Sequence, residues 1–182
     1  MLFFGDSLTA GYGLTNATQE SFPALIQQKI QQEGFNYTII NGGLSGDTSV
    51  GGLKRIDYWT SQPIHVFILE LGVNDIIRGI RPEVTQQNLQ EIIDKVKRKF
   101  PAVKMALMGM EIPLVIPGPF GDQFKKIFRL LADKNEMAFV PFFLEGVAGQ
   151  RHLNLKDGIH PYAAGYKINA DNVWPVIRML LK

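Results

Sequence analysis

The stretch that organises this sequence is Phe3-Phe4-Gly5-Asp6-Ser7-Leu8, in which an apolar run breaks at a glycine. The run over residues 1–4 predicts a buried strand. A serine directly after such a strand, beside a glycine that permits a tight turn, lies at the carboxyl edge of a sheet, where open α/β folds bind their ligands. Ser7 is therefore a candidate nucleophile. A second interpretation is equally open at this point, because Asp6 or Ser7 can simply cap the following helix.

Composition limits the classes of protein that fit. The chain has 182 residues, 46% of them hydrophobic and 20% charged, which predicts a single globular domain over residues 1–182. The net charge of +2 is too small to favour binding to nucleic acid or to an acidic membrane surface. The sequence contains no cysteine, which excludes disulfides, thiolate zinc sites and cysteine nucleophiles. No apolar run reaches the length of a membrane span, so we expect no transmembrane segment.

Apolar runs and helical patterns alternate along the chain. Apolar runs predict strands at residues 1–4, 37–40, 66–71, 103–110 and 138–141. Helical spacing and stop signals predict helices over 21–33, from about 53 to near 63, from 82 to about 100, over 122–135 and through 168–177. Glycine and polar residues predict loops at 8–18, with room for one short helical turn, and at 46–52 and 72–75. The alternation is typical of a doubly wound α/β domain, in which right-handed crossovers place helices on both faces of a parallel sheet.

Three loops that follow strands carry the groups that an acyl-transfer site needs. They are Gly5-Asp6-Ser7, Ser45-Gly46-Asp47 and Gly72-Val73-Asn74-Asp75. In a parallel sheet all three open on the same edge. The serine of the first loop can attack a carbonyl carbon, and three donors can face the oxyanion that forms. These donors are the N–H groups of that serine and of Gly46, and the side-chain amide of Asn74.

A histidine is the expected base, and the sequence has three. His65 begins the third predicted strand, and His152 lies in a polar stretch that we expect at the surface. Asp157 stands three residues before His160 in a predicted turn, so its carboxylate can accept from Nδ1–H and leave Nε2 free to face Ser7. The alternative is a turn in which Asp157 only caps the last helix.

Four segments in order along nearly the whole chain resemble the sequence blocks of a known family. They are Gly-Asp-Ser-Leu at 5–8, Gly46 within residues 45–49, Gly-Val-Asn-Asp at 72–75 and Asp-Gly-Ile-His-Pro at 157–161. The family is the GDSL, or SGNH, hydrolases, and the likeness is strongest to the bacterial branch of multifunctional thioesterases, arylesterases and lysophospholipases. The resemblance implies a three-layer α/β/α sandwich with a flavodoxin-like sheet of five parallel strands in the order 2-1-3-4-5.

The resemblance also implies roles for individual residues. It makes Ser7 the nucleophile, His160 the base and Asp157 the acid that orients the base. It makes oxyanion donors of the N–H groups of Ser7 and Gly46 and of the side-chain amide of Asn74. The substrates of the family are esters and thioesters, attacked through an acyl-enzyme without a cofactor.

Two segments are candidates for substrate binding. One matches a loop that borders the acyl site in such hydrolases, and its residues are Asp75, Ile76, Ile77, Arg78 and Gly79. The other is longer and more apolar than the tyrosine-bearing stretch of the relatives, and its apolar residues are Ile112, Leu114, Val115, Ile116 and Phe120. These five residues either line an acyl groove or cover the core as a buried loop, and both interpretations are open.

Other motifs do not fit. Gly11-Tyr12-Gly13 follows the first strand, but Asn16 replaces the last glycine of a dinucleotide-binding fingerprint. No phosphate-binding loop sequence occurs. We expect no metal and no cofactor, because no second pair of ligands accompanies Asp157 and His160. Three further acids are expected to brace loops rather than to act in catalysis: Asp6, Asp47 and Asp75.

The sequence therefore predicts a serine hydrolase that acts on acyl, aryl or lysophospholipid esters and on thioesters through an acyl-enzyme on Ser7. Two alternatives stay open: a carbohydrate O-acetyl esterase with the same residues, which segment 112–120 mildly disfavours, and a non-catalytic binding module that retains the fold. We expect a small-molecule or lipid-like ester as the partner, and no nucleic acid. The oligomeric state stays open, and so does the compartment. A strand at residue 1 fits a cytoplasmic protein and equally a chain whose export signal has been removed.

Overall fold

The computed structural model describes residues 1–111 and 119–182. The described residues form one sheet of five parallel strands in the order β2-β1-β3-β4-β5. The strands are β1 (Leu2–Gly5), β2 (Ile40–Gly43), β3 (Val66–Glu70), β4 (Lys104–Met108) and β5 (Ala138–Val140). The predicted fold class and strand order are thereby confirmed.

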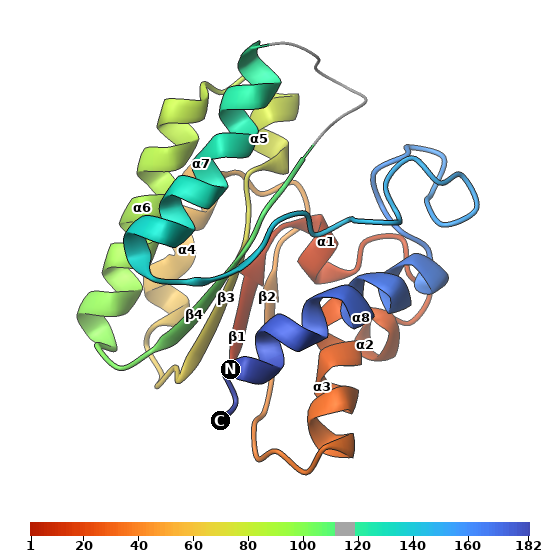
Figure 1. Ribbon diagram of the computed structural model, residues 1–182, viewed down its shortest axis with the longest axis horizontal. Helices are drawn as coiled ribbons and strands as arrows, with labels where there is room; N and C mark the ends of the chain where they lie inside the picture. Colours follow the sequence, from red (N-terminus) through yellow and green to blue (C-terminus); the bar gives the residue numbers. More distant parts are fainter. Residues whose placement is uncertain (112–118) are drawn as a thin grey trace.

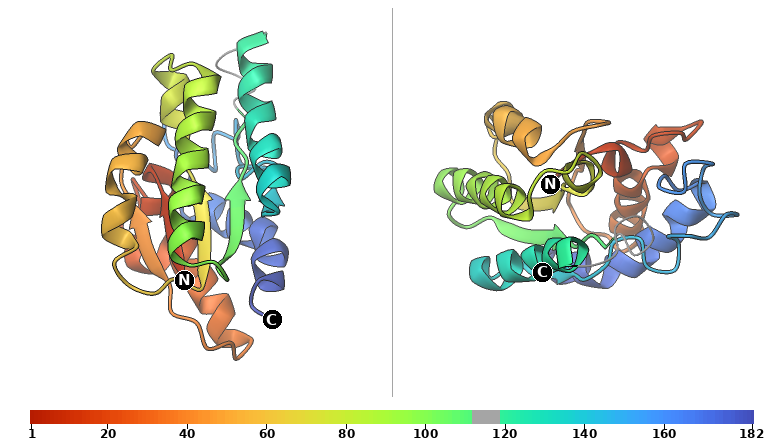
Figure 2. Two further views of the ribbon diagram at one scale, coloured as in Figure 1. Left: turned by 90° about the vertical axis from the view of Figure 1, so that its left-hand side faces the viewer. Right: turned by 90° about the horizontal axis from the view of Figure 1, so that it is seen from above.

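Helices cover both faces of the sheet. They are α1 (Ser7–Ala10), α2 (Ala17–Glu20), α3 (Phe22–Gln32), α4 (Ser49–Trp59), α5 (Val73–Ile77), α6 (Pro82–Lys99), α7 (Pro119–Asn135) and α8 (Ala163–Met179). Figures 1 and 2 show α3 and α8 packed together on one face, while α4, α6 and α7 lie side by side on the other. Right-handed crossovers between parallel strands produce this three-layer arrangement.

The long helices bury the apolar face that their sequence spacing predicts. In α6, Pro82 occupies the first turn, and Leu89, Ile92, Ile93 and Val96 are fully buried. Burying side chains of this size stabilises the fold by about 1.5–3 kcal/mol each. Within the part of the chain that the structure describes, no helix is long and apolar enough to cross a bilayer.

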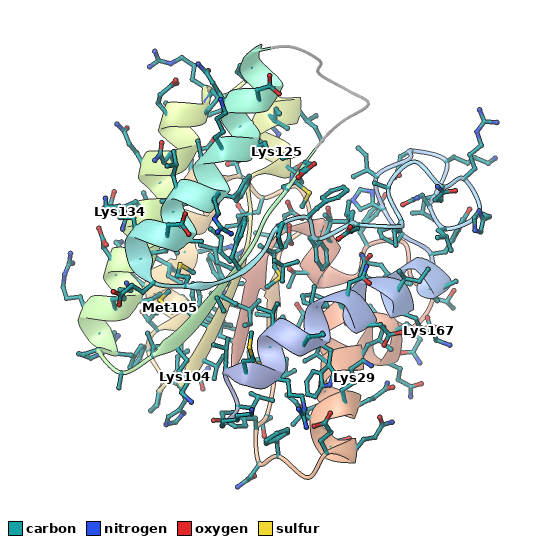
Figure 3. All side chains as sticks on the ribbon, in the orientation of Figure 1. Lys29, Lys104, Met105, Lys125, Lys134 and Lys167 are labelled. Atoms are coloured by element: carbon teal, nitrogen blue, oxygen red, sulfur yellow. The ribbon has the colours of Figure 1, made fainter. Side chains whose placement is uncertain are left out.

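A surface ion pair also joins α3 to α8. Figure 3 labels Lys29 on α3 beside α8, and its Nζ lies 2.6 Å from an Oδ1 atom of Asp171. The Asp171 side chain is 67% exposed, and exposed pairs contribute at most about 1 kcal/mol. The apolar contacts beneath the pair therefore hold the two helices together.

The second strand lies three residues later than predicted. The sequence indicated residues 37–40, but Ile40 pairs with Leu2 and Gly43 pairs with Gly5, so β2 spans Ile40–Gly43. Propensity argued against two glycines in a strand. A Cβ atom on Gly43 would lie 2.3 Å from the main-chain nitrogen of Ala10, so this edge strand needs glycine where α1 crosses it.

Several helix boundaries also differ from the prediction. Helix α4 begins at Ser49 rather than near residue 53, because the Thr48 side chain accepts from the N–H of Gly51 and caps the helix early. Helix α7 begins at Pro119 rather than Asp122. Short helices α1, α2 and α5 occupy parts of the predicted loops at 8–18 and 72–75.

Candidate active site

Ser7 lies at the carboxyl edge of the sheet, as the first residue of α1. Asp6 caps this short helix, because its Oδ1 accepts from the N–H of Leu8 at 3.0 Å. The Ser7 side chain takes no part in the cap, and the residue is 6% exposed. The structure confirms that Asp6 caps the helix, and it leaves the Ser7 hydroxyl to another partner.

That partner is His160, from the loop that precedes α8. The imidazole Nε2 of His160 lies 2.7 Å from Ser7 Oγ, and its Nδ1 lies 2.8 Å from Asp157 Oδ2. Figure 1 shows this loop, in blue, on the same edge of the sheet as α1. In contrast, His65 and His152 are exposed, as predicted for His152. The structure thus forms a continuous hydrogen-bonded series from a carboxylate through an imidazole to a serine hydroxyl.

The loop around Asp157 fixes the carboxylate as well as the imidazole. Asp157 Oδ1 accepts from the N–H groups of Ile159 at 2.9 Å and of His160 at 3.0 Å. Desolvation by itself raises the pKa of Asp157, but these hydrogen bonds and the adjacent imidazole outweigh it and hold the pKa below its usual value. The carboxylate therefore stays ionised beside the histidine, rather than capping α8 as the alternative interpretation had it.

A turn over residues 44–47 presents the backbone of Gly46. The N–H of Asp47 donates to the carbonyl of Leu44 at 3.0 Å, and Gly46 has φ = 78°. A positive φ at the third residue of a turn is the conformation that favours glycine. In the described part of the chain, the N–H groups of Ser7 and Gly46 donate no hydrogen bond. Both are therefore available to a ligand.

Asn74, on α5, links the serine loop to the Gly46 turn. Its Nδ2 donates to Asp6 Oδ2 at 3.1 Å and to the carbonyl of Asp47 at 2.9 Å. These acceptors are the neighbours of Ser7 and Gly46 in sequence. The three loops that were predicted to share one edge of the sheet are thus connected through a single side-chain amide.

The sequence that forms this site also matches a known family: residues 3–168 match the GDSL-like Lipase/Acylhydrolase family. The chain belongs to this family. Esterase TesA of Pseudomonas aeruginosa is 36% identical to it over 182 residues, which cover 100% of this chain and 89% of that protein. Thioesterase 1/protease 1/lysophospholipase L1 of Escherichia coli is 34% identical over 162 residues, or 88% of this chain and 74% of that protein. A crystal structure of TesA aligns with a TM-score of 0.92 at 36% identity, over 99% of this chain and 98% of the other.

As a GDSL-like acylhydrolase, the protein is an ester-hydrolysing enzyme. Arg55 supports the edge of the sheet on which Ser7 lies. Arg55 donates to Asp47 Oδ2 at 2.6 Å, to the carbonyl of Gly42 at 2.7 Å and to the carbonyl of Gly5 at 2.8 Å. Its guanidinium also lies 3.9 Å from the ring centroid of Phe4. One side chain thereby joins the ends of β1 and β2 to the Gly46 turn.

The acylhydrolase buries two of the residues predicted for substrate binding. Asp75 is fully buried, and its carboxylate accepts from the N–H and hydroxyl of Ser49 and from the hydroxyl of Thr85 at 2.9 Å. It therefore braces the loops, as predicted in the alternative role. Ile76 is 2% exposed and belongs to the core. We leave both residues out of the substrate surface, because neither offers area to a ligand.

The rest of the predicted substrate surface divides into three groups. Ile77, Arg78 and Gly79 are exposed at the end of α5, and Arg78 Nη2 donates to the carbonyl of Gly46 at 2.7 Å. Phe120 is half-buried at the start of α7 and packs against the core. The other predicted residues lie outside the described residues: Ile112, Leu114, Val115 and Ile116.

A buried acid beneath the serine was missed by the sequence analysis. Glu70, at the end of β3, accepts through Oε2 from the Thr9 hydroxyl at 2.7 Å and from the N–H of Asp6 at 3.3 Å. Burial, and then the neighbouring Asp6, raises the pKa of Glu70 well above its usual value. The signal was a single acid in an otherwise apolar strand, which a central strand tolerates only with partners.

In the described ranges, no three His, Cys, Asp or Glu side chains are grouped so as to hold a metal ion.

Asp6 gives the hydrolase an unusual dependence of stability on pH. Burial raises the pKa of Asp6 to about 7 from an ordinary value of 3.8, although the hydrogen bond from Leu8 opposes the shift. Between these two values the folded state retains a proton that the unfolded chain releases. The folded protein therefore loses stability through Asp6 as pH rises from about 4 to about 7. We expect Asp6→Asn to remove a decline of about 2–4 kcal/mol.

Urea unfolding of both chains between about pH 4 and pH 8 measures this decline. Asp57→Asn is the control, because Asp57 is 68% exposed and pairs with Lys95 at the surface. Parallel stability curves for wild type and Asp6→Asn would show that Asp6 titrates normally.

Proposed function

We propose that this acylhydrolase is a serine esterase and thioesterase that works through an acyl-enzyme on Ser7, with His160 as general base and Asp157 as the acid that orients it. The observation that carries the proposal is the hydrogen-bonded series from Asp157 Oδ2 through the imidazole to Ser7 Oγ, with contacts of 2.8 and 2.7 Å. An ionised carboxylate on Nδ1 fixes the tautomer in which Nε2 can accept a proton. The low pKa of Asp157 supports this assignment.

Acylation follows from this arrangement. Ser7 Oγ forms a bond to the carbonyl carbon while its proton moves to His160 Nε2, and the carbonyl electron pair becomes an oxyanion. The intermediate then breaks its bond to the alcohol or thiol, which leaves with the proton from Nε2. Deacylation repeats the sequence with water as the nucleophile, and the acid product and free Ser7 are released.

Three donors are proposed for the oxyanion. The N–H groups of Ser7 and Gly46 carry no other hydrogen bond among the described residues, so they can donate without breaking one. Asn74 differs, because its Nδ2 already donates to Asp6 and to Asp47. An oxyanion bond from Asn74 therefore requires one of these N–H groups to be shared. Donors held in advance cost little reorganisation during the reaction.

The acyl chain is proposed to lie along the apolar segment 112–120, and this part rests on the sequence. Replacing Ile116 with aspartate is expected to raise KM for p-nitrophenyl octanoate far more than for p-nitrophenyl acetate, since only the longer chain reaches an apolar groove. Leu130→Asp is the control, because Leu130 is a 56% exposed side chain on α7. Equal increases in KM for the two esters would contradict an acyl groove at this segment. A preference of the wild type for the acetate ester would favour a deacetylase.

Trapping the acyl-enzyme tests the proposed function directly. Mixing the enzyme with excess p-nitrophenyl acetate is expected to give a burst of one p-nitrophenolate per active site when deacylation is slow. Mass spectrometry of the acid-quenched protein is then expected to find one acetyl group on the peptide that contains Ser7. An acetyl group on any other residue, with the same turnover, would assign the nucleophile elsewhere.

A further inference from the structure

An aromatic ring lies in contact with the His160 imidazole. The ring centroids of Tyr12 and His160 are 4.7 Å apart, and their planes are inclined by 51°. Its bond to Cβ and the hydrogen bonds at Nδ1 and Nε2 set the orientation of the imidazole. The contact with Tyr12 adds a further restraint on the side-chain torsions of His160. The His160 side chain is accordingly only 16% exposed.

The turn that carries the nucleophile also positions Tyr12. Gly11, with φ = 82°, forms the C-cap of α1, and the N–H groups of Gly11 and Tyr12 both donate to the carbonyl of Ser7 at 3.0 Å. The main chain of Tyr12 is therefore bonded to Ser7, while its ring contacts His160. The base and the nucleophile are held in one unit by this residue, in addition to their own hydrogen bond.

The ring can act on the reaction itself. The imidazole is neutral before the attack and becomes an imidazolium when Ser7 transfers its proton. An aromatic face attracts a cation more strongly than a neutral ring. This contact therefore strengthens as the transition state forms, and such an interaction raises kcat rather than only lowering KM.

We propose that Tyr12 is a positioning residue for the hydrolytic reaction, whose ring fixes the orientation of the His160 imidazole and stabilises the imidazolium that forms during attack by Ser7. The inference rests on the proposed function, because it acts through the proton transfer between Ser7 and His160. Tyr12 is 52% exposed, so its ring contributes little to the core, and we expect substitutions there to leave the fold intact.

Two variants of Tyr12 and one control separate positioning from packing. Tyr12→Phe retains the ring, and Tyr12→Leu retains an apolar side chain without a ring. Tyr58→Leu is the control, because Tyr58 is a 75% exposed tyrosine at the end of α4 that contacts Trp59. Two rates are measured: hydrolysis of p-nitrophenyl acetate, and inactivation by a small fluorophosphonate, in which Ser7 Oγ bonds to phosphorus and fluoride leaves.

We expect Tyr12→Leu to lower kcat and the rate of inactivation by about 3- to 10-fold, with KM unchanged, and Tyr12→Phe to restore both. Tyr58→Leu is expected to match the wild type. Equal rates for the phenylalanine and leucine variants, or a change in KM alone, would overturn the role of Tyr12. The proposed function would still stand in that case, provided that the fluorophosphonate labels Ser7. If the fluorophosphonate labels no Ser7 in the wild type, the proposed function fails, and the role of Tyr12 fails with it.

Discussion

Replacement of Ser7 by alanine is expected to lower kcat/KM for p-nitrophenyl esters by about 10⁴- to 10⁶-fold. The reason is that Ser7 Oγ is the atom that His160 Nε2 contacts at 2.7 Å, and alanine leaves the imidazole without a nucleophile to activate. The measurement is hydrolysis of esters from acetate to dodecanoate by both proteins. The chain-length profile of the wild type then defines the acyl group that the enzyme prefers.

Ser61→Ala is a matched control for this loss. Ser61 is an exposed serine after α4, and its hydroxyl donates to the carbonyl of Tyr58. We expect this variant to keep wild-type activity. If Ser7→Ala retains more than about a hundredth of the wild-type rate, the nucleophile is another group. Equal, slow hydrolysis of every ester by both proteins would leave a substrate of another kind or a non-catalytic binding role.

Replacement of Arg55 by methionine is expected to lower the free energy of unfolding by about 3–5 kcal/mol. The side chains of Arg55 and Asp47 are only 18% and 5% exposed, so the substitution leaves a buried carboxylate without its cation. It also removes donors from the carbonyls of Gly5 and Gly42. Because Asp47 belongs to the Gly46 turn, we expect activity to fall as well.

Urea unfolding measures this loss, and two further variants interpret it. Arg129→Met breaks an exposed i,i+4 pair with Asp133, so we expect a change below about 1 kcal/mol. Combining Arg55→Met with Asp47→Asn removes the unpaired charge and is expected to recover part of the stability. A loss from Arg55→Met no larger than that from Arg129→Met would mean that the guanidinium does not hold the turn.

The alternation of apolar runs was enough to predict the sheet, because each predicted strand followed or preceded a clear helical pattern. The loops of Ser7, Gly46 and Asn74 were predicted to share an edge for the same reason, since parallel strands present their carboxyl ends together. The Asp157–His160 spacing predicted the hydrogen bond at Nδ1. These features depend on order and local spacing, which the sequence contains directly.

The burial of individual side chains and the contacts between distant elements were harder to predict. Helix α5 has only five residues, so the sequence did not indicate that Asp75 and Ile76 face inward while Ile77 is exposed. The position of β2 depended on the contact between Gly43 and the backbone of Ala10, which lie far apart in the chain. Glu70 was visible as an acid in an apolar strand, but its partners come from other elements.

Tyr12 shows the same limit for the site. It was considered only as part of Gly11-Tyr12-Gly13, a motif that failed for nucleotide binding. Its contact with His160 arises because the first turn of the chain and the loop before α8 meet in space, and no spacing along the sequence indicates that meeting.

The contact between Ser7 and His160 has a consequence for how the enzyme becomes active. The proposed nucleophile Ser7 belongs to α1, and its proposed base His160 lies after all five strands, just before α8. The proposed catalytic pair therefore cannot assemble on the ribosome until the loop before α8 has emerged and closed onto α1. During refolding, hydrolysis should recover only when this closure is complete, later than helical circular dichroism, so that turnover reports the docking of the loop before α8 onto α1.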